Sequence, residues 1–171
     1  NVSTHSGKWE KTKYLGTEVT GKILGLIGAG NIGSVVASRA IGLKMRIVAY
    51  DPFLSSERAM ALGVTRVETL VEVLSCADFL SLHLPRTEKT KNLISYSEIS
   101  SMKRGAKLIN CARGGLVDEI AVANAIRSGH LGGAAFDVFN EEPAFNSPLF
   151  GLENVVCTPH LGASTKEAQE N

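Results

Sequence analysis

The chain has 171 residues, of which 44% are hydrophobic and 20% are charged, and its formal net charge at pH 7 is +1. This length fits one domain with a substantial core, and the composition is ordinary for a globular protein. The small net charge argues against a chain built chiefly to hold nucleic acid or a membrane surface, and no apolar run approaches the roughly 20 residues of a membrane span.

The first twenty residues contain Lys8, Lys11 and Lys13 around Trp9 and Tyr14 and show no clear helical or strand period. Two interpretations stay open for this arm. It is either a solvated segment pinned by its two aromatic side chains, or a basic strip that faces an anionic ligand or a neighbouring subunit.

The arm is followed by the segment around which the chain is organised. From Ile23 an apolar run leads directly into Gly-x-Gly-x-x-Gly, which ends at Gly33, and an amphipathic segment, 34–43, begins at once. A second apolar run, 45–50, ends in Asp51. Strand, glycine triplet, helix, strand and acid in this order are typical of a dinucleotide-binding β-α-β unit.

Each part of this unit has its own role. Gly28 allows the tight turn after the strand, Gly30 lets the backbone approach a pyrophosphate, and Gly33 lets the helix pack closely on the strand. The helix N-terminus offers free N–H groups and a partial positive charge to the phosphates. Asp51 is placed to accept hydrogen bonds from the adenosine ribose hydroxyls and would repel a 2′-phosphate, which predicts NAD rather than NADP.

Alternating strands and helices continue to the end of the chain. We expect strands at 64–67, 79–84, 107–110, 132–136 and 154–157, and helices at 55–63, 69–76, 95–105 and 118–128. The expected N-caps are Ser55 or Ser56, Thr69 with Glu72, Ser95 with Glu98, and Asp118. About seven strand–helix alternations predict an α/β fold, a doubly wound parallel sheet of Rossmann type.

The two remaining features concern cysteines and the C-terminus. Cys76 and Cys157 lie in apolar surroundings, and with Cys111 they form no Cys-x-x-Cys pair, so we expect two buried thiols in a reducing compartment, the cytoplasm. Residues 164–167 form a capping box that opens a helix, yet the chain stops at Asn171. We therefore expect residues 1–171 to be a piece of a longer protein.

Reactive side chains gather where the strands are expected to end. Ligands bind outside the carboxyl ends of parallel strands. The residues at or just after these ends are Asp51, His83, Arg113, Asp137, Glu142 and His160. We expect them to converge on one edge of the sheet.

Oxidation of an alcohol by hydride transfer needs a base, a cation for a substrate anion, and a group that tunes the base. Histidine, arginine and a carboxylate suit these roles. His160 follows a strand, Arg113 precedes a glycine pair that leaves room for a ligand, and Glu141 or Glu142 could reach a histidine. Three alternatives stay open. Arg113 could pair with a surface acid, Glu141 and Glu142 could simply form an acidic turn, and His83 could be the base.

Three stretches, 110–119, 134–143 and 159–169, resemble the signatures of the D-isomer-specific 2-hydroxyacid dehydrogenases, in the family's order. The resemblance implies that Arg113 holds the substrate carboxylate, that His160 is the acid–base and that Glu142 is its partner, with Asp137 near the nicotinamide carboxamide. It implies NAD as cofactor, no metal, and cofactor contacts at Gly28, Gly30, Asn31, Ile32, Gly33, Asp51, Leu84, Cys111, Ala112, Arg113, Asp137, His160, Leu161, Gly162 and Ala163.

The last of these stretches most resembles the branch of the family that oxidises 3-phospho-D-glycerate to 3-phosphooxypyruvate, the entry to serine synthesis. The enzymatic alternative is a hydroxypyruvate or glyoxylate reductase, or another D-2-hydroxyacid dehydrogenase. An alternative of another class is an NAD-sensing binding module, like the transcriptional corepressors that share this fold.

The family also implies a homodimer or homotetramer, and a second domain, built from both ends of a longer chain, that closes over the substrate. Residues 1–171 match only the cofactor-binding domain, and residues 164–171 would begin the helix that leads back to the missing domain. Three positions depart from the family's habits, one of them Asn140 in place of a more common threonine. Leu84 replaces a frequent threonine, and Arg86 could reach the adenosine side of the cofactor or a substrate phosphate.

Overall fold

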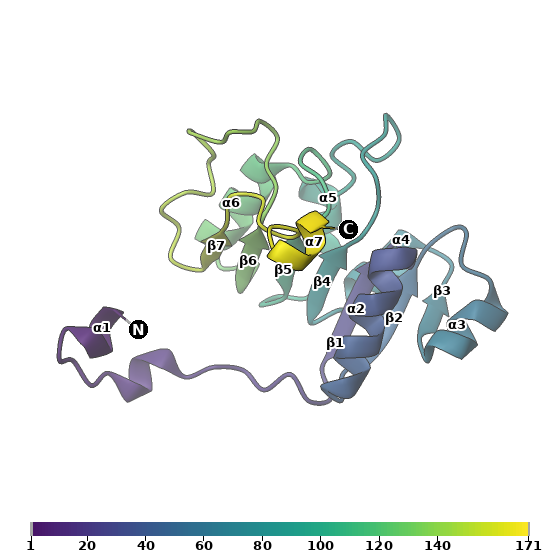
Figure 1. The fold of residues 1–171 in the computed structure, drawn as a ribbon, viewed down its shortest axis with the longest axis horizontal. Coiled ribbons are helices and arrows are strands. Elements are labelled where there is room, and N and C mark those ends of the chain that lie inside the picture. Colours follow the sequence, from purple (N-terminus) through teal and green to yellow (C-terminus); the bar gives the residue numbers. More distant parts are fainter. Residues whose placement is uncertain (1, 171) are drawn as a thin grey trace.

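The structure, a computed structural model, describes residues 2–170 and is built on a seven-stranded sheet (Figure 1). The strands are β1 (Ile23–Ile27), β2 (Arg46–Tyr50), β3 (Thr65–Val67), β4 (Phe79–Leu82), β5 (Lys107–Asn110), β6 (Gly133–Phe136) and β7 (Val155–Cys157). Their spatial order is β3-β2-β1-β4-β5-β6-β7, and every pairing is parallel. The predicted doubly wound parallel sheet is confirmed.

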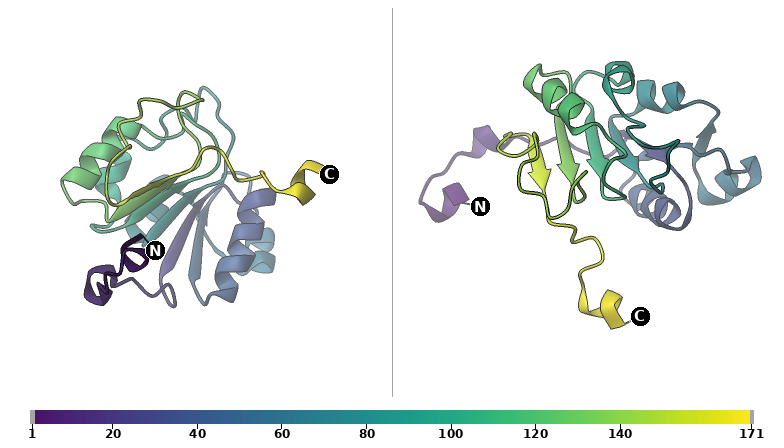
Figure 2. Two further views of the ribbon diagram at one scale, coloured as in Figure 1. Left: turned by 60° about the vertical axis from the view of Figure 1, so that its left-hand side comes forward. Right: turned by 90° about the horizontal axis from the view of Figure 1, so that it is seen from above.

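Helices cover both faces of this sheet. The helices that cover it are α2 (Asn31–Gly42), α3 (Ser56–Leu62), α4 (Leu70–Cys76), α5 (Tyr96–Ser101) and α6 (Glu119–Arg127). Helix α1 (Val2–His5), the 3-10 helix η1 (Lys11–Tyr14) and helix α7 (Lys166–Glu170) lie on the terminal segments. Figure 2 shows α2 and α3 on one face and α4, α5 and α6 on the other. Each face has its own apolar core, and the larger one lies under α4, α5 and α6. Gly25 lets α4 approach β1, because a Cβ there would lie 2.8 Å from Ala77.

Two boundaries beside the predicted cofactor site differ from expectation. Helix α2 begins at Asn31, three residues before the predicted start, because the Ser34 N–H already bonds the Gly30 carbonyl at 2.9 Å. Strand β4 ends at Leu82, not at residue 84. Leu82 is the register partner of Ile27, the last residue of β1, and Pro85 has no N–H with which to continue a ladder.

The predicted caps are largely confirmed. Thr69 and Glu72 bond each other's backbone, the Ser95 N–H donates to the Glu98 carboxylate at 3.1 Å, and the Asp118 carboxylate accepts two N–H groups at the start of α6. Ser55 rather than Ser56 caps α3. Helix α5 is shorter than predicted, because the backbone turns extended at Met102, whose side chain is buried in the core. At α7 the cap is Thr165, whose hydroxyl accepts the Ala168 N–H at 3.1 Å, and not Ser164.

Both ends of the described chain project from the domain (Figures 1 and 2). In the N-terminal arm, Trp9 is 85% exposed and Tyr14 is 60% exposed. The prediction that these aromatic side chains pin the arm is therefore wrong, because both lie outside the two apolar cores of residues 2–170. The outermost residues of the predicted terminal segments, Asn1 and Asn171, lie outside the described part of the chain.

Within residues 2–170 no helix combines the length and the apolarity that a membrane crossing requires. Cys76, Cys111 and Cys157 are unpaired thiols. Cys76 and Cys157 are half-buried rather than fully buried as predicted, since Cys76 ends a helix and Cys157 lies on the edge strand β7.

Candidate active site

The glycine-rich turn after β1 is shaped by close backbone contacts. Gly28 has φ of +93°, and a Cβ there would collide with the His83 carbonyl oxygen. A Cβ on Gly33 would collide with the Gly28 carbonyl oxygen. Gly30 differs, because nothing lies within 4 Å of its Cβ position. The first and third glycines thus pack the turn, and the second leaves an open approach to the N-terminus of α2, where Asn31 and Ile32 are exposed.

Asp51, directly after β2, is held beside this turn. One of its carboxylate oxygens accepts the Ala29 N–H at 2.8 Å, and the other accepts the Phe53 N–H at 2.8 Å. An ionised carboxylate has about four acceptor sites, so each oxygen keeps capacity for a further donor. The half-buried carboxylate therefore joins the end of β2 to the glycine turn and retains acceptor sites for ribose hydroxyls.

Of the two histidines that follow strands, His83 is turned into the fold. Its Nε2 lies 2.9 Å from the Ser81 hydroxyl, and burial lowers the pKa of its imidazole. Leu84 is half-buried against the larger core. A base needs access to a substrate hydroxyl, so the geometry disfavours His83 for that role.

Arg113 lies on the loop after β5, and a buried side chain shapes this loop. Asn110, 1% exposed, accepts the Ala112 N–H at 3.1 Å and donates to the Arg113 carbonyl at 3.0 Å. Arg113 itself is exposed, and its guanidinium donates to the Ala112 carbonyl at 2.6 Å. Among residues 2–170 no carboxylate forms an ion pair with Arg113, so the alternative of a surface ion pair is not seen.

Asp137 ends β6 and organises the turn that carries His160. The carboxylate is 5% exposed and accepts bonds from the Thr158 hydroxyl at 2.5 Å, the Leu161 N–H at 2.7 Å and the Gly162 N–H at 2.8 Å. Burial acts to raise the pKa of this carboxyl, but these hydrogen bonds outweigh it and hold the pKa below its ordinary value. These contacts anchor the turn after β7, and the position of Asp137 near the nicotinamide, which the family resemblance implies, stays a prediction.

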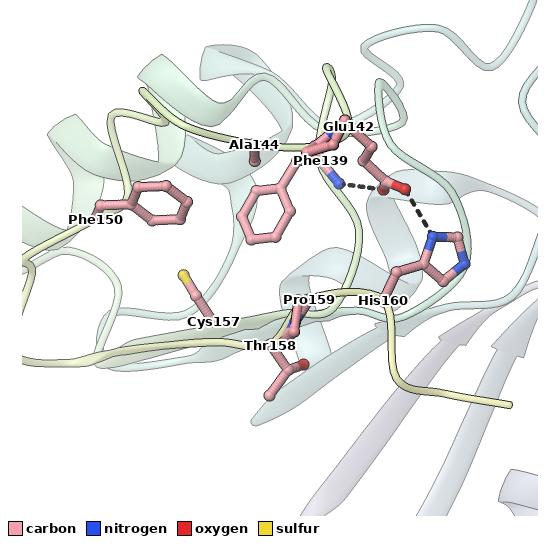
Figure 3. A pocket seen from close by; sticks show the side chains of 9 residues that line it. Phe139, Glu142, Ala144, Phe150, Cys157, Thr158, Pro159 and His160 are labelled. Carbon is pink, nitrogen blue, oxygen red and sulfur yellow. Dashed lines mark hydrogen bonds and ion pairs between the residues drawn. The ribbon is translucent and has the colours of Figure 1, made fainter. Parts of the chain in front are cut away.

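His160 and Glu142 form the pair at the centre of the site (Figure 3). The imidazole Nδ1 lies 2.7 Å from one Glu142 oxygen, and the other oxygen accepts the Phe139 N–H at 2.9 Å. The bond with His160, followed by the bond from Phe139, lowers the pKa of Glu142. His160 has φ of +54°, and its N–H donates to the Asp137 carbonyl at 2.8 Å. With Nδ1 on the carboxylate, the second ring nitrogen points away from Glu142 and is open to a ligand.

A cavity of about 530 Å³ opens beside this pair, and the sequence did not predict it. Phe139 and Phe150 meet edge to face within it, with ring centroids 5.5 Å apart, and the Cys157 side chain points towards the two rings on the side away from His160 (Figure 3). The lining of this cavity is mainly apolar, with Glu142 and His160 at one side.

The family model of the NAD-binding domain of D-isomer-specific 2-hydroxyacid dehydrogenases matches residues 1–162. The chain belongs to this family. Its cofactor is NAD, and the predicted resemblance is confirmed.

Several relatives of this NAD-binding domain are D-3-phosphoglycerate dehydrogenases. The chain is 48% identical over 171 residues to that of Bacillus subtilis and 50% identical over 171 residues to that of Synechocystis, and it spans 32% and 31% of their lengths. Among solved structures, TT0316 from Thermus thermophilus has a TM-score of 0.89 at 39% identity, covering 99% of this chain and 53% of that one. A glyoxylate reductase from Paecilomyes thermophila has a TM-score of 0.91 at 33% identity, covering 99% and 51%.

The NAD-binding domain brings most of the predicted site residues to one edge of its sheet. The glycine turn, Asp51 and the loops after β4, β5 and β6 all follow the carboxyl ends of parallel strands. Cys111, Leu161, Gly162 and Ala163 are exposed there, while Leu84 and Ala112 are half-buried. Sequence reasoning missed Asn110, although an asparagine that ends a strand before a glycine-rich loop is a recognisable local turn signal.

Proposed function

We propose that this chain is the cofactor-binding part of an NAD-dependent D-2-hydroxyacid dehydrogenase that oxidises 3-phospho-D-glycerate to 3-phosphooxypyruvate in L-serine biosynthesis. The observation that carries this proposal is the 2.7 Å contact between His160 and Glu142 beside the exposed Arg113 loop. A histidine oriented by a carboxylate is a device for moving a proton near neutral pH.

Each residue of the proposed site has one role in the reaction. The guanidinium of Arg113 holds the substrate carboxylate through two parallel hydrogen bonds. The free nitrogen of His160 takes the proton of the 2-hydroxyl as the alcohol becomes a ketone. Glu142 keeps the ring oriented and stabilises the imidazolium that results. NAD, when bound, accepts the hydride that leaves the same carbon.

The proposed cofactor contacts follow the same edge. The open Gly30 side and the start of α2, with Asn31 and Ile32, receive the pyrophosphate, and Asp51 receives the adenosine ribose. Asp137, Leu84 and the exposed residues 111–113 and 160–163 border the nicotinamide half. The three bonds to Asp137 support an indirect part for it, because they leave little of its carboxylate for the carboxamide.

The substrate is proposed from the relatives. The D-3-phosphoglycerate dehydrogenases of Bacillus subtilis and Synechocystis are 48% and 50% identical to this chain, and a phosphorylated substrate suits the cations of the arm. Glyoxylate reductase is the second candidate, because a protein of that name has the same fold at 33% identity with its chain half covered. Cytoplasmic location, supported by three free thiols, and assembly into a homodimer or homotetramer belong to the same proposal.

We also propose that residues 1–171 work as one domain of a longer chain whose other domain closes over the substrate. In this arrangement residues 164–170, which project from the domain, lead towards the second domain (Figure 2). Closure would exclude water and complete the contacts to the substrate.

The test is a substrate panel on the full-length protein, with His160→Ala as the decisive variant. We expect 3-phospho-D-glycerate to give the highest kcat/KM, and His160→Ala to lower kcat by roughly 10²- to 10⁴-fold while NAD affinity stays unchanged. A loss below about tenfold would assign the base to another residue. Tight NAD binding without turnover of any 2-hydroxy acid would favour the sensing module instead.

A further inference from the structure

Glu142 stands on a long connection that has little regular structure of its own. The segment between β6 and β7, residues 137–154, contains no helix or strand, and Glu142 is exposed on it. The Phe139 N–H donates to the Glu142 carboxylate within the loop, and Phe139 itself is buried in the larger core. The position of the carboxylate next to His160 therefore depends on what braces this loop.

The side chain of Glu119 provides such a brace from the start of α6. One of its carboxylate oxygens accepts the Asn140 N–H at 2.8 Å, and the other accepts the Ser147 hydroxyl at 2.6 Å. These two contacts lie on either side of Glu142 in the chain. Glu119 is half-buried, and the helix does not need it as a cap, because Asp118 accepts the N–H groups of Ile120 and Ala121.

The same loop is packed against the loop that carries Arg113. A Cβ on Gly114 would collide with the Phe139 carbonyl oxygen, so the two backbones touch. Helix α6 follows the Arg113 loop directly and presents Glu119 at its first position. The Glu142 loop is thus in contact with the Arg113 loop at Gly114 and with the first residue of α6 at Glu119.

We propose that Glu119 is a positioning residue that clamps both arms of the Glu142 loop and so sets the contact between Glu142 and His160. It touches neither His160 nor Glu142, and its effect on turnover passes through the loop. This inference rests on the proposed function for its kinetic consequence, but its geometric part does not.

The kinetic test uses the full-length dehydrogenase. Glu119→Ala removes both contacts, and we expect kcat to fall roughly 10- to 100-fold, as for a displaced catalytic group, with KM for NAD unchanged. Glu119→Gln should restore most of the rate, because its amide oxygen can accept from Asn140 while its NH₂ donates to Ser147. The matched control is Glu141→Ala, which removes the same charge from an exposed residue of the loop.

A double-mutant cycle separates positioning from a general loss of stability. If Glu119 acts through Glu142, Glu119→Ala should cost nothing further in kcat once Glu142→Gln is present. Equal losses in both backgrounds would overturn the proposal, as would a Glu119→Gln variant as slow as Glu119→Ala with both folded.

A second measurement needs no turnover. Hydrogen bonds from His160 and Phe139 hold the pKa of Glu142 below its ordinary value, so carboxyl carbon NMR titration of the 171-residue chain reports that contact. We expect Glu119→Ala to raise the pKa of Glu142 and Glu141→Ala to leave it unchanged. An unchanged value in a folded Glu119→Ala would refute the clamp. If the full-length protein oxidises no 2-hydroxy acid, the proposed function fails while this titration still decides the role of Glu119.

Discussion

Asp51→Asn tests whether one carboxylate selects NAD. The substitution removes a negative charge from the end of β2 and keeps the side-chain shape. The Asp51 carboxylate would repel the 2′-phosphate of NADP. Two unit charges about 4 Å apart repel by about 4 kcal/mol at an effective dielectric of 20. Asp51 is half-buried, so we take roughly half of this value for a site open to salt and water, about 2 kcal/mol. That corresponds to about a 30-fold rise in NADP affinity relative to NAD affinity.

The relative affinity is the diagnostic quantity because the substitution also disturbs the turn. Asparagine can replace only one of the two acceptors that bind the Ala29 and Phe53 N–H groups, so affinity for both cofactors should fall. Calorimetry with NAD and NADP on the 171-residue chain gives the ratio directly. Glu57→Gln, an exposed charge change in the first turn of α3, is the control and should leave the ratio nearly unchanged.

Two results would refute this reasoning. One is a wild-type chain that binds NAD and NADP equally well. The other is a folded Asp51→Asn variant that loses NAD affinity without any shift in the ratio, which would make the carboxylate a brace for the turn and no more.

Three further predictions concern stability, the arm and the isolated chain. Asp137→Asn should destabilise the domain by about 2–3 kcal/mol at pH 7. The pKa of Asp137 is depressed in the folded state, so its contribution to stability is complete above the unfolded pKa of about 3.9 and is lost as pH falls through the lower folded value. Calorimetric melting should therefore show the stability difference between Asp137→Asn and wild type closing below about pH 4. A stability difference that stays constant with pH would contradict this. Replacing Lys8, Lys11 and Lys13 together by glutamine should raise KM more for the phosphorylated substrate than for an unphosphorylated analogue, and an equal rise would mark the arm as a solvated face. The 171-residue chain alone should bind NAD but turn over poorly in steady-state assays, because a single exposed ion pair at Arg113 contributes only about 0–1 kcal/mol; a rate near that of the full-length protein would argue against domain closure.

The fold could be read from the sequence because its signals are local. The glycine triplet, the capping boxes at Thr69 and Ser95, and the alternation of apolar runs with amphipathic segments each depend on residues close together in the chain. The errors fell where a distant partner decides the outcome. Strand β4 ends at Leu82 because its neighbour β1 ends at Ile27, and the arm has no cover for Trp9 within residues 2–170.

The site was only partly accessible to the same reasoning. The sequence offered two histidines after strands and two neighbouring glutamates, and it could not choose between members of either pair. The structure turned His83 towards Ser81 and placed Glu142, 18 residues before His160 in the chain, at 2.7 Å from its ring.

By itself, then, the sequence determined the kind of fold, the dinucleotide turn and the types of reactive side chain at the strand ends, since backbone preferences and periodicity act over a few residues. Only the tertiary structure decided that Asp137 anchors the His160 turn and that Glu119 reaches both arms of the Glu142 loop. The reason is physical: parallel strands bring their carboxyl ends to one edge regardless of separation in the chain, but which side chains meet there depends on how the connecting loops pack against one another.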